Sequence, residues 1–498
     1  MNTLVALCAV GAEKILGNEI KLLGYKLVSN AAGRVTFAGD DDALFRANLC
    51  LRTADRVYLQ LADYAACDFD ALFDGVYAVP WQDFLRKDSR VVVDKVRTHR
   101  SALASEHSIQ GMVQKAIYTK LGDVWHIQTL PESGEESDVR VYIEDDRALV
   151  LLDLSGLPLH KRGYRTDGGI APLRETTAAA LLQLMLWRRK TALHDPFCGS
   201  GTIPIEAALY AYNVAPGFGR RFALESLPIF DPRRALDIKR AEAEKIRTDV
   251  AVRITGTDAD PAAVARARAN AEHACVMAGR ALNLIDKSDK VPRPDFDVAD
   301  FRDISAPYES GLLLCNPPYG ERIGDEAAAE ALYRDMAQLF AEFKGWQVGV
   351  ITAHSRFQDC IGRYASALKT IKAGNLDTVF YMYDGTEAQK PPCAPSSPRP
   401  APHKRAARPD WRERRNNADD SARSNDTRRK PHNGADWRGN ADDSEHSNDT
   451  RRKPRNGDSW REQRGNASDD YSRTRNGRTR YGNADSARSR RRNAPEEF

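Results

Sequence analysis

Short apolar segments alternate with amphipathic ones along residues 191–384, and this pattern constrains the fold more than any other feature of the sequence. The apolar segments have the length of buried strands, and the segments between them show the apolar spacing of helices. Regular alternation of this kind predicts an α/β domain built on a doubly wound, Rossmann-like parallel sheet. Polar residues that directly follow different strands then meet at one edge of the sheet, where such folds bind ligands.

Residues 1–155 predict a second, mixed α/β region. Strand-like runs lie at 3–10, 26–37, 91–96, 139–145 and 148–155, and helical spacing occurs at 12–23 and 108–121. This region has no cluster of side chains that suggests catalysis. We therefore expect the chemistry in the part of the chain that follows it.

After about residue 388 the sequence can no longer build a core. From 391 to 498 the only residue among Leu, Ile, Val, Met and Phe is the final Phe498, so burial cannot offset the entropy of ordering the chain. This segment holds 26 basic and 17 acidic residues, a net charge of +9, whereas residues 1–390 carry −5. Residues 417–438 return with few changes at 440–461, but neither copy has an apolar face for stacking. We expect a disordered, Arg/Asn/Asp-rich repeat tail at 389–498.

The eight cysteines and the N-terminus indicate a cytoplasmic protein. The cysteines are scattered, with no CxxC pair and no matching His spacing, which predicts free thiols and neither a zinc site nor a disulfide framework. The first 25 residues contain acidic side chains and lack the apolar core of a signal peptide. No stretch approaches 18 uninterrupted apolar residues, so we expect no membrane span, and we expect no bound metal.

The stretch HDPFCGSGT (194–202) predicts a ligand-binding loop between a strand and a helix. Gly199 and Gly201 allow a tight turn and close approach of a ligand to the backbone, and the helix start offers free N–H groups. A phosphate-binding loop would place a lysine after its glycines, and none follows here. Because Asp195 would repel phosphates, the loop suits a ligand with a positive centre and no phosphates. A plain glycine turn is the alternative.

Further acids follow the next two strands. Asp258 ends the strand in VRITGTD, where an acid of dinucleotide folds binds ribose hydroxyls, whereas Asp260 and Pro261 are explained as helix N-cap and first helical residue. Asp300 and Phe301 offer an acceptor for an exocyclic amine beside a ring that can stack, although a solvated loop acid explains this pair equally well. Three strand-end acids and a glycine turn together predict a nucleoside site without a phosphate grip. S-adenosylmethionine fits that description.

The sequence NPPY at 316–319 directly follows the apolar run LLLC. Pro317 and Pro318 lack a backbone N–H, so they end sheet pairing and hold the turn rigid. If the Asn316 side-chain oxygen and the Pro317 carbonyl accept the N–H groups of a planar amine, its nitrogen can rehybridise and attack a methyl group. Tyr319 can stack on a base that has left its helix. We expect these four residues to be catalytic; a proline turn without a function is the alternative.

These motifs together resemble one family. LPLHKRGYR, APLRETTAAALL, DPFCGSGTIPIEAAL, NVAPGF and NPPYGERIG look like the THUMP-domain, class I S-adenosylmethionine-dependent RNA methyltransferases, and most like the RlmL-like type that acts on guanine N2 of large-subunit ribosomal RNA. The resemblance covers about residues 1–388. It implies a ferredoxin-like domain at 1–65, a THUMP RNA-binding domain at 66–156 and the methyltransferase domain at 157–388. The cofactor site it implies comprises Asp195, Phe197, Gly199, Gly201, Asp258, Asp300 and Phe301.

The activity implied by this resemblance is methyl transfer to guanosine N2 in 23S ribosomal RNA, with the large-subunit precursor as partner. Residues 97–117 resemble the THUMP segment that approaches RNA. The longest family members continue into a second methyltransferase domain, whereas this chain has its Arg-rich tail, so we expect no second activity. NPPY alone also fits adenine-N6 methylation of RNA or DNA, and methylation of a glutamine side chain in a protein. The non-enzymatic alternative is an RNA-binding or ribosome-assembly protein whose main functional part is the tail.

Overall fold

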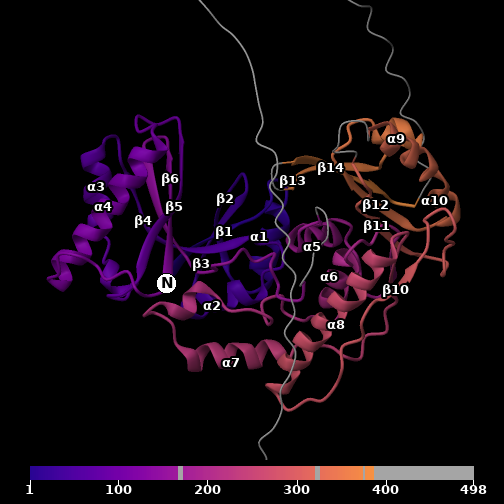
Figure 1. The fold of residues 1–498 in the computed structure, drawn as a ribbon, viewed down its shortest axis with the longest axis horizontal. Helices are drawn as coiled ribbons and strands as arrows, with labels where there is room; N and C mark the ends of the chain where they lie inside the picture. Colours follow the sequence, from indigo (N-terminus) through magenta and orange to yellow (C-terminus); the bar gives the residue numbers. More distant parts are fainter. Residues whose placement is uncertain (166–171, 320–325, 374–375, 386–498) are drawn as a thin grey trace, which may run out of the picture. The chain divides into compact units, whose positions relative to one another are not determined.

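The computed structural model describes residues 1–165, 172–319, 326–373 and 376–385, and all of them lie in one unit, Met1–Pro402. Their strands form two seven-stranded sheets, each accompanied by helices (Figure 1). The α/β fold class expected from the sequence is therefore confirmed. The tail predicted at 389–498 lies outside the described residues. Among the described helices, none combines the length and the apolar character needed to span a membrane.

The first sheet contains the strands of the N-terminal region. In spatial order they are β2 (Lys26–Ala31), β3 (Arg34–Gly39), β1 (Asn2–Leu7), β4 (Arg56–Ala65), β7 (Arg147–Asp153), β6 (Glu136–Glu144) and β5 (Arg90–His99). Neighbouring strands are antiparallel except β5 and β6. The run at 26–37, predicted as one strand, is two strands, because Gly33 takes a left-handed conformation (φ +73°) and the chain reverses there.

Strand β4 lies in the middle of this sheet. Its Tyr58 pairs with Val5 of β1 on one side and with Asp153 of β7 on the other. One continuous sheet therefore includes strands from both of the regions expected at 1–65 and 66–156. Apolar residues of the strands share a core with the helices of this region. These helices are α1 (Glu13–Leu22), α2 (Asp41–Cys50), α3 (Phe69–Tyr77), the 3₁₀ turn η1 (Trp81–Asp83) and α4 (Glu106–Trp125).

The second sheet corresponds to the predicted Rossmann-like region. In spatial order its strands are β10 (Asp295–Val298), β9 (Ile254–Asp258), β8 (Ala192–Asp195), β11 (Gly311–Cys315), β12 (Gln347–Thr352), β14 (Leu376–Tyr383) and β13 (Ala367–Ala373). The predicted parallel pairing does not extend to β14, which is antiparallel to both of its neighbours. Only two residues separate β13 from β14, too few for the crossover that parallel pairing requires.

Helices cover both faces of this second sheet. Leu312 and Leu314 of β11 belong to the core that includes α5, α6 and α8, whereas Leu313 and Cys315 belong to the core that includes α9, α10 and α11. Burial on both faces explains why the strand is apolar at every position and does not alternate. The helices and 3₁₀ turn of this region are α5 (Glu175–Leu184), α6 (Thr202–Ala211), η2 (Ala223–Ser226), α7 (Pro232–Ala243), α8 (Pro261–Asn283), α9 (Glu326–Asp335), α10 (Ala337–Glu342) and α11 (Phe357–Ile361).

Candidate active site

The order of the strands brings the predicted site residues to one edge of the second sheet. Strand β8 has β9 on one side and β11 on the other, so the chain reverses its direction of winding at β8. Open α/β sheets bind their ligands at such a switch point, outside the carboxyl ends of the strands. Asp195 is the last residue of β8, Asp258 is the last residue of β9, and Asn316 follows the last residue of β11.

The glycine loop after β8 is held from β9 and α8. The Gly199 N–H donates to Asp258 Oδ2 at 2.9 Å, and the Cys198 N–H donates to the Thr257 carbonyl at 2.9 Å. From α8, the side-chain amide of Asn270 donates to the Ser200 carbonyl at 3.0 Å. Asp258, predicted to bind a ligand, therefore also fixes the loop, whereas Asn270 was not among the predicted site residues.

The two glycines of this loop have different surroundings. Both take left-handed conformations, with φ of +53° at Gly199 and +82° at Gly201. A Cβ on Gly201 would lie 3.0 Å from both Ala267 Cβ and Phe296 Cζ, whereas a Cβ on Gly199 would meet no atom of the described residues within 4 Å. Gly201 is thus needed for packing, while the backbone at Gly199 is open to a ligand.

Two acids lie close together at the ends of β8 and β9. Asp195 is 1% exposed, and its Oδ1 accepts the Phe197 N–H at 3.1 Å. Burial raises the pKa of Asp195 well above its usual range, and the nearby Asp258 charge raises it further, against the opposing effect of the Phe197 hydrogen bond. Burial, with a contribution from Asp195, also raises the pKa of the Cys315 thiol. A positively charged ligand here would favour the ionised form of Asp195.

Asp300 and Phe301 follow β10 and contact Arg302. The Arg302 guanidinium pairs with Asp300 Oδ2 at 3.0 Å and with Asp335 Oδ2, on α9, at 2.8 Å. The Phe301 ring is 5% exposed; its centroid lies 4.9 Å from the Phe197 centroid and 4.7 Å from the Arg302 guanidinium carbon. Arg302 was missed in the sequence analysis because its partner Asp335 lies 33 residues away along the chain. The adenine contacts of Asp300 and Phe301 stay predictions.

The NPPY turn begins where β11 ends. Pro317 is buried and Pro318 is exposed. The Tyr319 hydroxyl donates to Asn316 Oδ1, the atom predicted to accept the amine of the substrate. An incoming amine would therefore have to displace this hydroxyl. From α9, the Tyr333 hydroxyl donates to the Pro318 carbonyl at 2.6 Å, a contact that no local sequence pattern indicates.

The motif LPLHKRGYR forms a buried brace beneath the glycine loop. Arg162 Nε lies 3.5 Å from Glu206 Oε1 on α6, and the Tyr164 hydroxyl donates to the same oxygen at 3.1 Å. Arg165 donates to the hydroxyl of Thr202, the first residue of α6, at 2.6 Å. The motif therefore fixes the helix that begins directly after Gly201.

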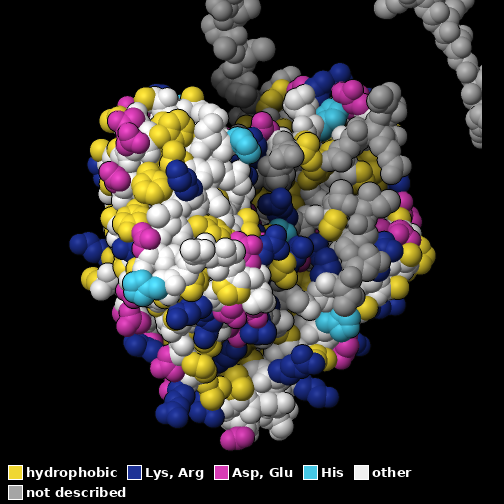
Figure 2. Space-filling view, turned by 60° about the vertical axis from the view of Figure 1, so that its left-hand side comes forward, with side chains coloured by type: hydrophobic (Ala, Val, Ile, Leu, Met, Phe, Trp, Pro, Cys, Tyr) yellow, Lys and Arg dark blue, Asp and Glu magenta, His cyan; other side chains and the backbone are white. Residues whose placement is uncertain are grey.

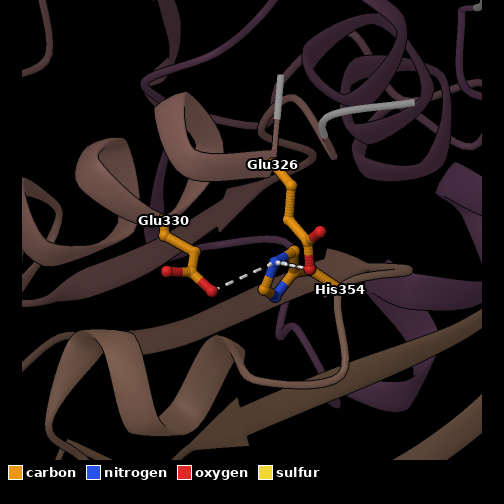
Figure 3. A group of neighbouring side chains, drawn as sticks. All are labelled: Glu326, Glu330 and His354. Carbon is orange, nitrogen blue, oxygen red and sulfur yellow. Dashed lines mark ion pairs between the residues drawn. The ribbon is translucent and has the colours of Figure 1, made fainter. Parts of the chain in front are cut away.

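Glu326, Glu330 and His354 point toward one another beside α9 (Figure 3). His354 Nε2 lies 3.7 Å from a Glu326 oxygen and 3.9 Å from a Glu330 oxygen. These are metal-ligating residue types, but their contacts do not fit a metal. His354 Nδ1 accepts the Arg356 N–H, so a neutral ring carries its proton on Nε2 and has no lone pair there. Arg356 and Arg334 bind the two Glu330 oxygens at 2.9 and 3.2 Å. We interpret the trio as a structural polar cluster, in which the ion pair between Glu330 and Arg356 ties α9 to the segment after β12.

A seven-stranded sheet with this strand order and one reversed strand defines the class I methyltransferase fold. Comparison with known proteins identifies the family within that class. Residues 162–381 match the family model described as "RMKL-like, methyltransferase domain", and residues 3–58 match the one described as "RlmL ferredoxin-like domain". The chain belongs to the RMKL-like methyltransferases. The predicted methyltransferase family and ferredoxin-like N-terminal domain are thus confirmed, whereas the THUMP domain at 66–156 stays a prediction.

Two relatives illustrate the extent of the similarity. The putative RNA methyltransferase YpsC of Bacillus subtilis (strain 168) is 38% identical over 388 residues, which cover 76% of this chain and 95% of that protein. The ribosomal RNA large subunit methyltransferase K/L of Photobacterium profundum is 31% identical over 392 residues, which cover 77% of this chain but 53% of that protein. The present chain therefore spans about half the length of the K/L relative.

Two solved structures share the fold along most of their length. SMU.472, a putative methyltransferase complexed with SAH, is 34% identical with a TM-score of 0.68, and the match covers 78% of this chain and 99% of that one. A predicted N6-adenine-specific DNA methylase from Listeria monocytogenes str. 4b F2365 is 35% identical with a TM-score of 0.68, and the match covers 77% of this chain and 96% of that one.

Proposed function

We propose that this chain transfers the methyl group of S-adenosylmethionine to the exocyclic N2 amine of a guanosine in 23S ribosomal RNA. The observation that carries the proposal is the NPPY turn at the switch point of the second sheet, on the strand next to the one that leads into the glycine loop. The turn has acceptors for a planar amine, and the loop suits a cationic ligand without phosphates. The names of the relatives, RNA methyltransferase and rRNA large subunit methyltransferase, support RNA as the substrate.

The residues at the switch point fit S-adenosylmethionine as the cofactor. The backbone at Gly199 is open, and Asp195 and Asp258 favour a positive ligand. The SAH in the similar structure agrees with this assignment. When bound, the cofactor supplies an electrophilic methyl group on a sulfonium. We assign its binding to Asp195, Phe197, Gly199 and Gly201 in and beside the loop, Asp258 for the ribose hydroxyls, and Asp300 with Phe301 for the adenine.

The NPPY residues act on the acceptor amine. Asn316 Oδ1 and the Pro317 carbonyl accept the two amine N–H groups, which lets the nitrogen direct its lone pair at the methyl group. Pro317 and Pro318 keep these acceptors rigid. Tyr319 releases Asn316 and stacks on the extruded base. Positioning and charge stabilisation account for the reaction without a covalent enzyme intermediate.

Recognition of the RNA is assigned to residues 66–156, as a THUMP domain acting in the cytoplasm on the large-subunit precursor. On the face shown in Figure 2, basic and acidic side chains are interspersed, so charge alone does not mark an RNA site there. Within the segment 97–117, Arg97 pairs with Glu106 at 2.8 Å, and Arg100 pairs with Asp145 at 2.9 Å. These pairs are exposed and cost little to exchange for phosphates, about 0–1 kcal/mol each.

Adenine-N6 methylation is the second candidate function. It is favoured by the similarity to the predicted N6-adenine-specific DNA methylase, and NPPY does not by itself choose the base. One experiment separates the candidates: purified protein is incubated with labelled S-adenosylmethionine and, in parallel, with unmodified ribosomal RNA, genomic DNA and a protein extract. Our proposal expects label in the large-subunit RNA. Label in DNA favours the second candidate, label in protein favours the alternative of protein methylation, and label in none indicates a non-catalytic protein.

A further inference from the structure

We infer that Tyr333 is a positioning residue for methyl transfer, which holds the NPPY turn through a directed chain of hydrogen bonds. The inference rests on the proposed function of the turn and extends it to a residue on α9. Tyr333 is fully buried, and its ring packs edge-on against Phe357 and His354, with centroids 5.1 and 5.4 Å apart. These ring contacts fix the hydroxyl independently of the turn that it binds.

The direction of the hydrogen bonds follows from counting protons. The Tyr333 hydroxyl has one proton, and the Pro318 carbonyl, 2.6 Å away, can only accept it. Tyr333 must then accept from Thr352, whose Oγ1 lies 3.1 Å from the tyrosine oxygen. Thr352 Oγ1 in turn accepts the backbone N–H of His354 at 3.0 Å. Protons are thus donated in one direction, from His354 through Thr352 and Tyr333 to Pro318, and such chains strengthen each member.

This chain determines which carbonyl of the turn remains available. Neither Pro317 nor Pro318 has an N–H, so each of these two residues can form backbone hydrogen bonds only through its carbonyl. Tyr333 binds the carbonyl of Pro318. The carbonyl of Pro317 is then left to the acceptor amine, together with the Asn316 side chain. Without the Tyr333 hydroxyl, the Pro318 carbonyl loses this donor, and nothing in the chain of hydrogen bonds then sets it apart from the Pro317 carbonyl.

The test removes this hydroxyl alone. Tyr333→Phe keeps the ring contacts and deletes the donor. The matched control is Tyr383→Phe, because Tyr383 is also buried on the second sheet and its hydroxyl has no hydrogen-bond partner among the described residues. We expect Tyr333→Phe to lower kcat about tenfold, the rate effect of one hydrogen bond, with the KM values for cofactor and RNA nearly unchanged. Thr352→Val should lower kcat less, and the double variant should be no slower than Tyr333→Phe, because the two residues act in one chain.

A second readout does not depend on activity. Hydrogen exchange of the peptide that contains Tyr319, the first residue after the prolines with an N–H, should be faster in Tyr333→Phe than in wild type and unchanged in Tyr383→Phe. Unchanged exchange in Tyr333→Phe would overturn the inference, as would a kcat within twofold of an active wild type or an equal loss in the control. If wild-type protein methylates nothing while exchange rises as expected, the positioning contact stands and the proposed function fails.

Discussion

Because the two glycines of the loop have different surroundings, we expect alanine to impair mainly folding stability at Gly201 and mainly cofactor binding at Gly199. Alanine at a positive φ costs about 1–2 kcal/mol at either position. At Gly201 the added methyl would also lie 3.0 Å from Ala267 Cβ and Phe296 Cζ, and overpacking of this kind adds about 1–3 kcal/mol. We therefore expect Gly201→Ala to lower the free energy of unfolding by about 2–5 kcal/mol and Gly199→Ala by about 1–2 kcal/mol.

Cofactor binding should show the reverse order. Among the residues that the structure describes, no atom lies within 4 Å of the added methyl in Gly199→Ala, so this methyl would occupy the space that we assign to the ligand. We expect micromolar binding by the wild type and a Kd at least about tenfold higher, a loss of about 1.4 kcal/mol, in Gly199→Ala. Urea unfolding and calorimetric titration with S-adenosylmethionine measure the two quantities. Wild-type affinity in Gly199→Ala, or an equal loss of stability in both variants, would refute this assignment of roles.

Three further predictions concern the turn, the core and the tail. Asn316→Ala should lower methyl transfer by about 10²–10³ while cofactor affinity is retained, and activity within tenfold of wild type would make the motif structural. Burial lowers the pKa of His194 to about 4, so folding excludes its proton and stability is lost as the pH falls from about 6.5 to 4. The free energies of unfolding of wild type and His194→Gln are measured with urea, and their difference should change by about 3 kcal/mol over that pH range. A difference that does not change with pH would contradict the burial argument. Truncation after residue 390 should leave cofactor affinity unchanged, raise the KM for RNA and flatten the salt dependence of RNA binding, whereas the same affinity and salt slope as the full chain would show an inert tail.

Features that depend on local pattern were predictable from the sequence. Residue spacing predicted the buried apolar strand before NPPY, the glycine loop and the N-cap role of Asp260. The structure contains each of them. The meeting of Asp195, Asp258 and Asn316 at one edge was predictable as well, because parallel strands share the direction of their carboxyl ends. The antiparallel direction of β14 could be predicted only from the length of its connection to β13, and the apolar pattern alone does not show where that connection begins and ends.

Features that depend on distant pairs were not predictable. The Tyr333 hydroxyl reaches Pro318 across 15 residues, and Arg302 reaches Asp335 across 33, and neither distance corresponds to a helical or strand period. The role of Asp258 in holding Gly199 also required the geometry of the loop, since ribose binding was the only role that its position after a strand suggested. Such contacts decide how rigid the site is, which composition and periodicity do not encode.

The identity of the methylated nucleoside tests the central proposal most directly. Unmodified large-subunit ribosomal RNA is incubated with the full chain and labelled S-adenosylmethionine, digested to nucleosides, and analysed by mass spectrometry, with the Asn316→Ala variant as the matched control. We predict labelled N2-methylguanosine with the wild type and its loss with the variant. Label in N6-methyladenosine, or label in N2-methylguanosine that persists in the Asn316→Ala variant, would contradict the proposal.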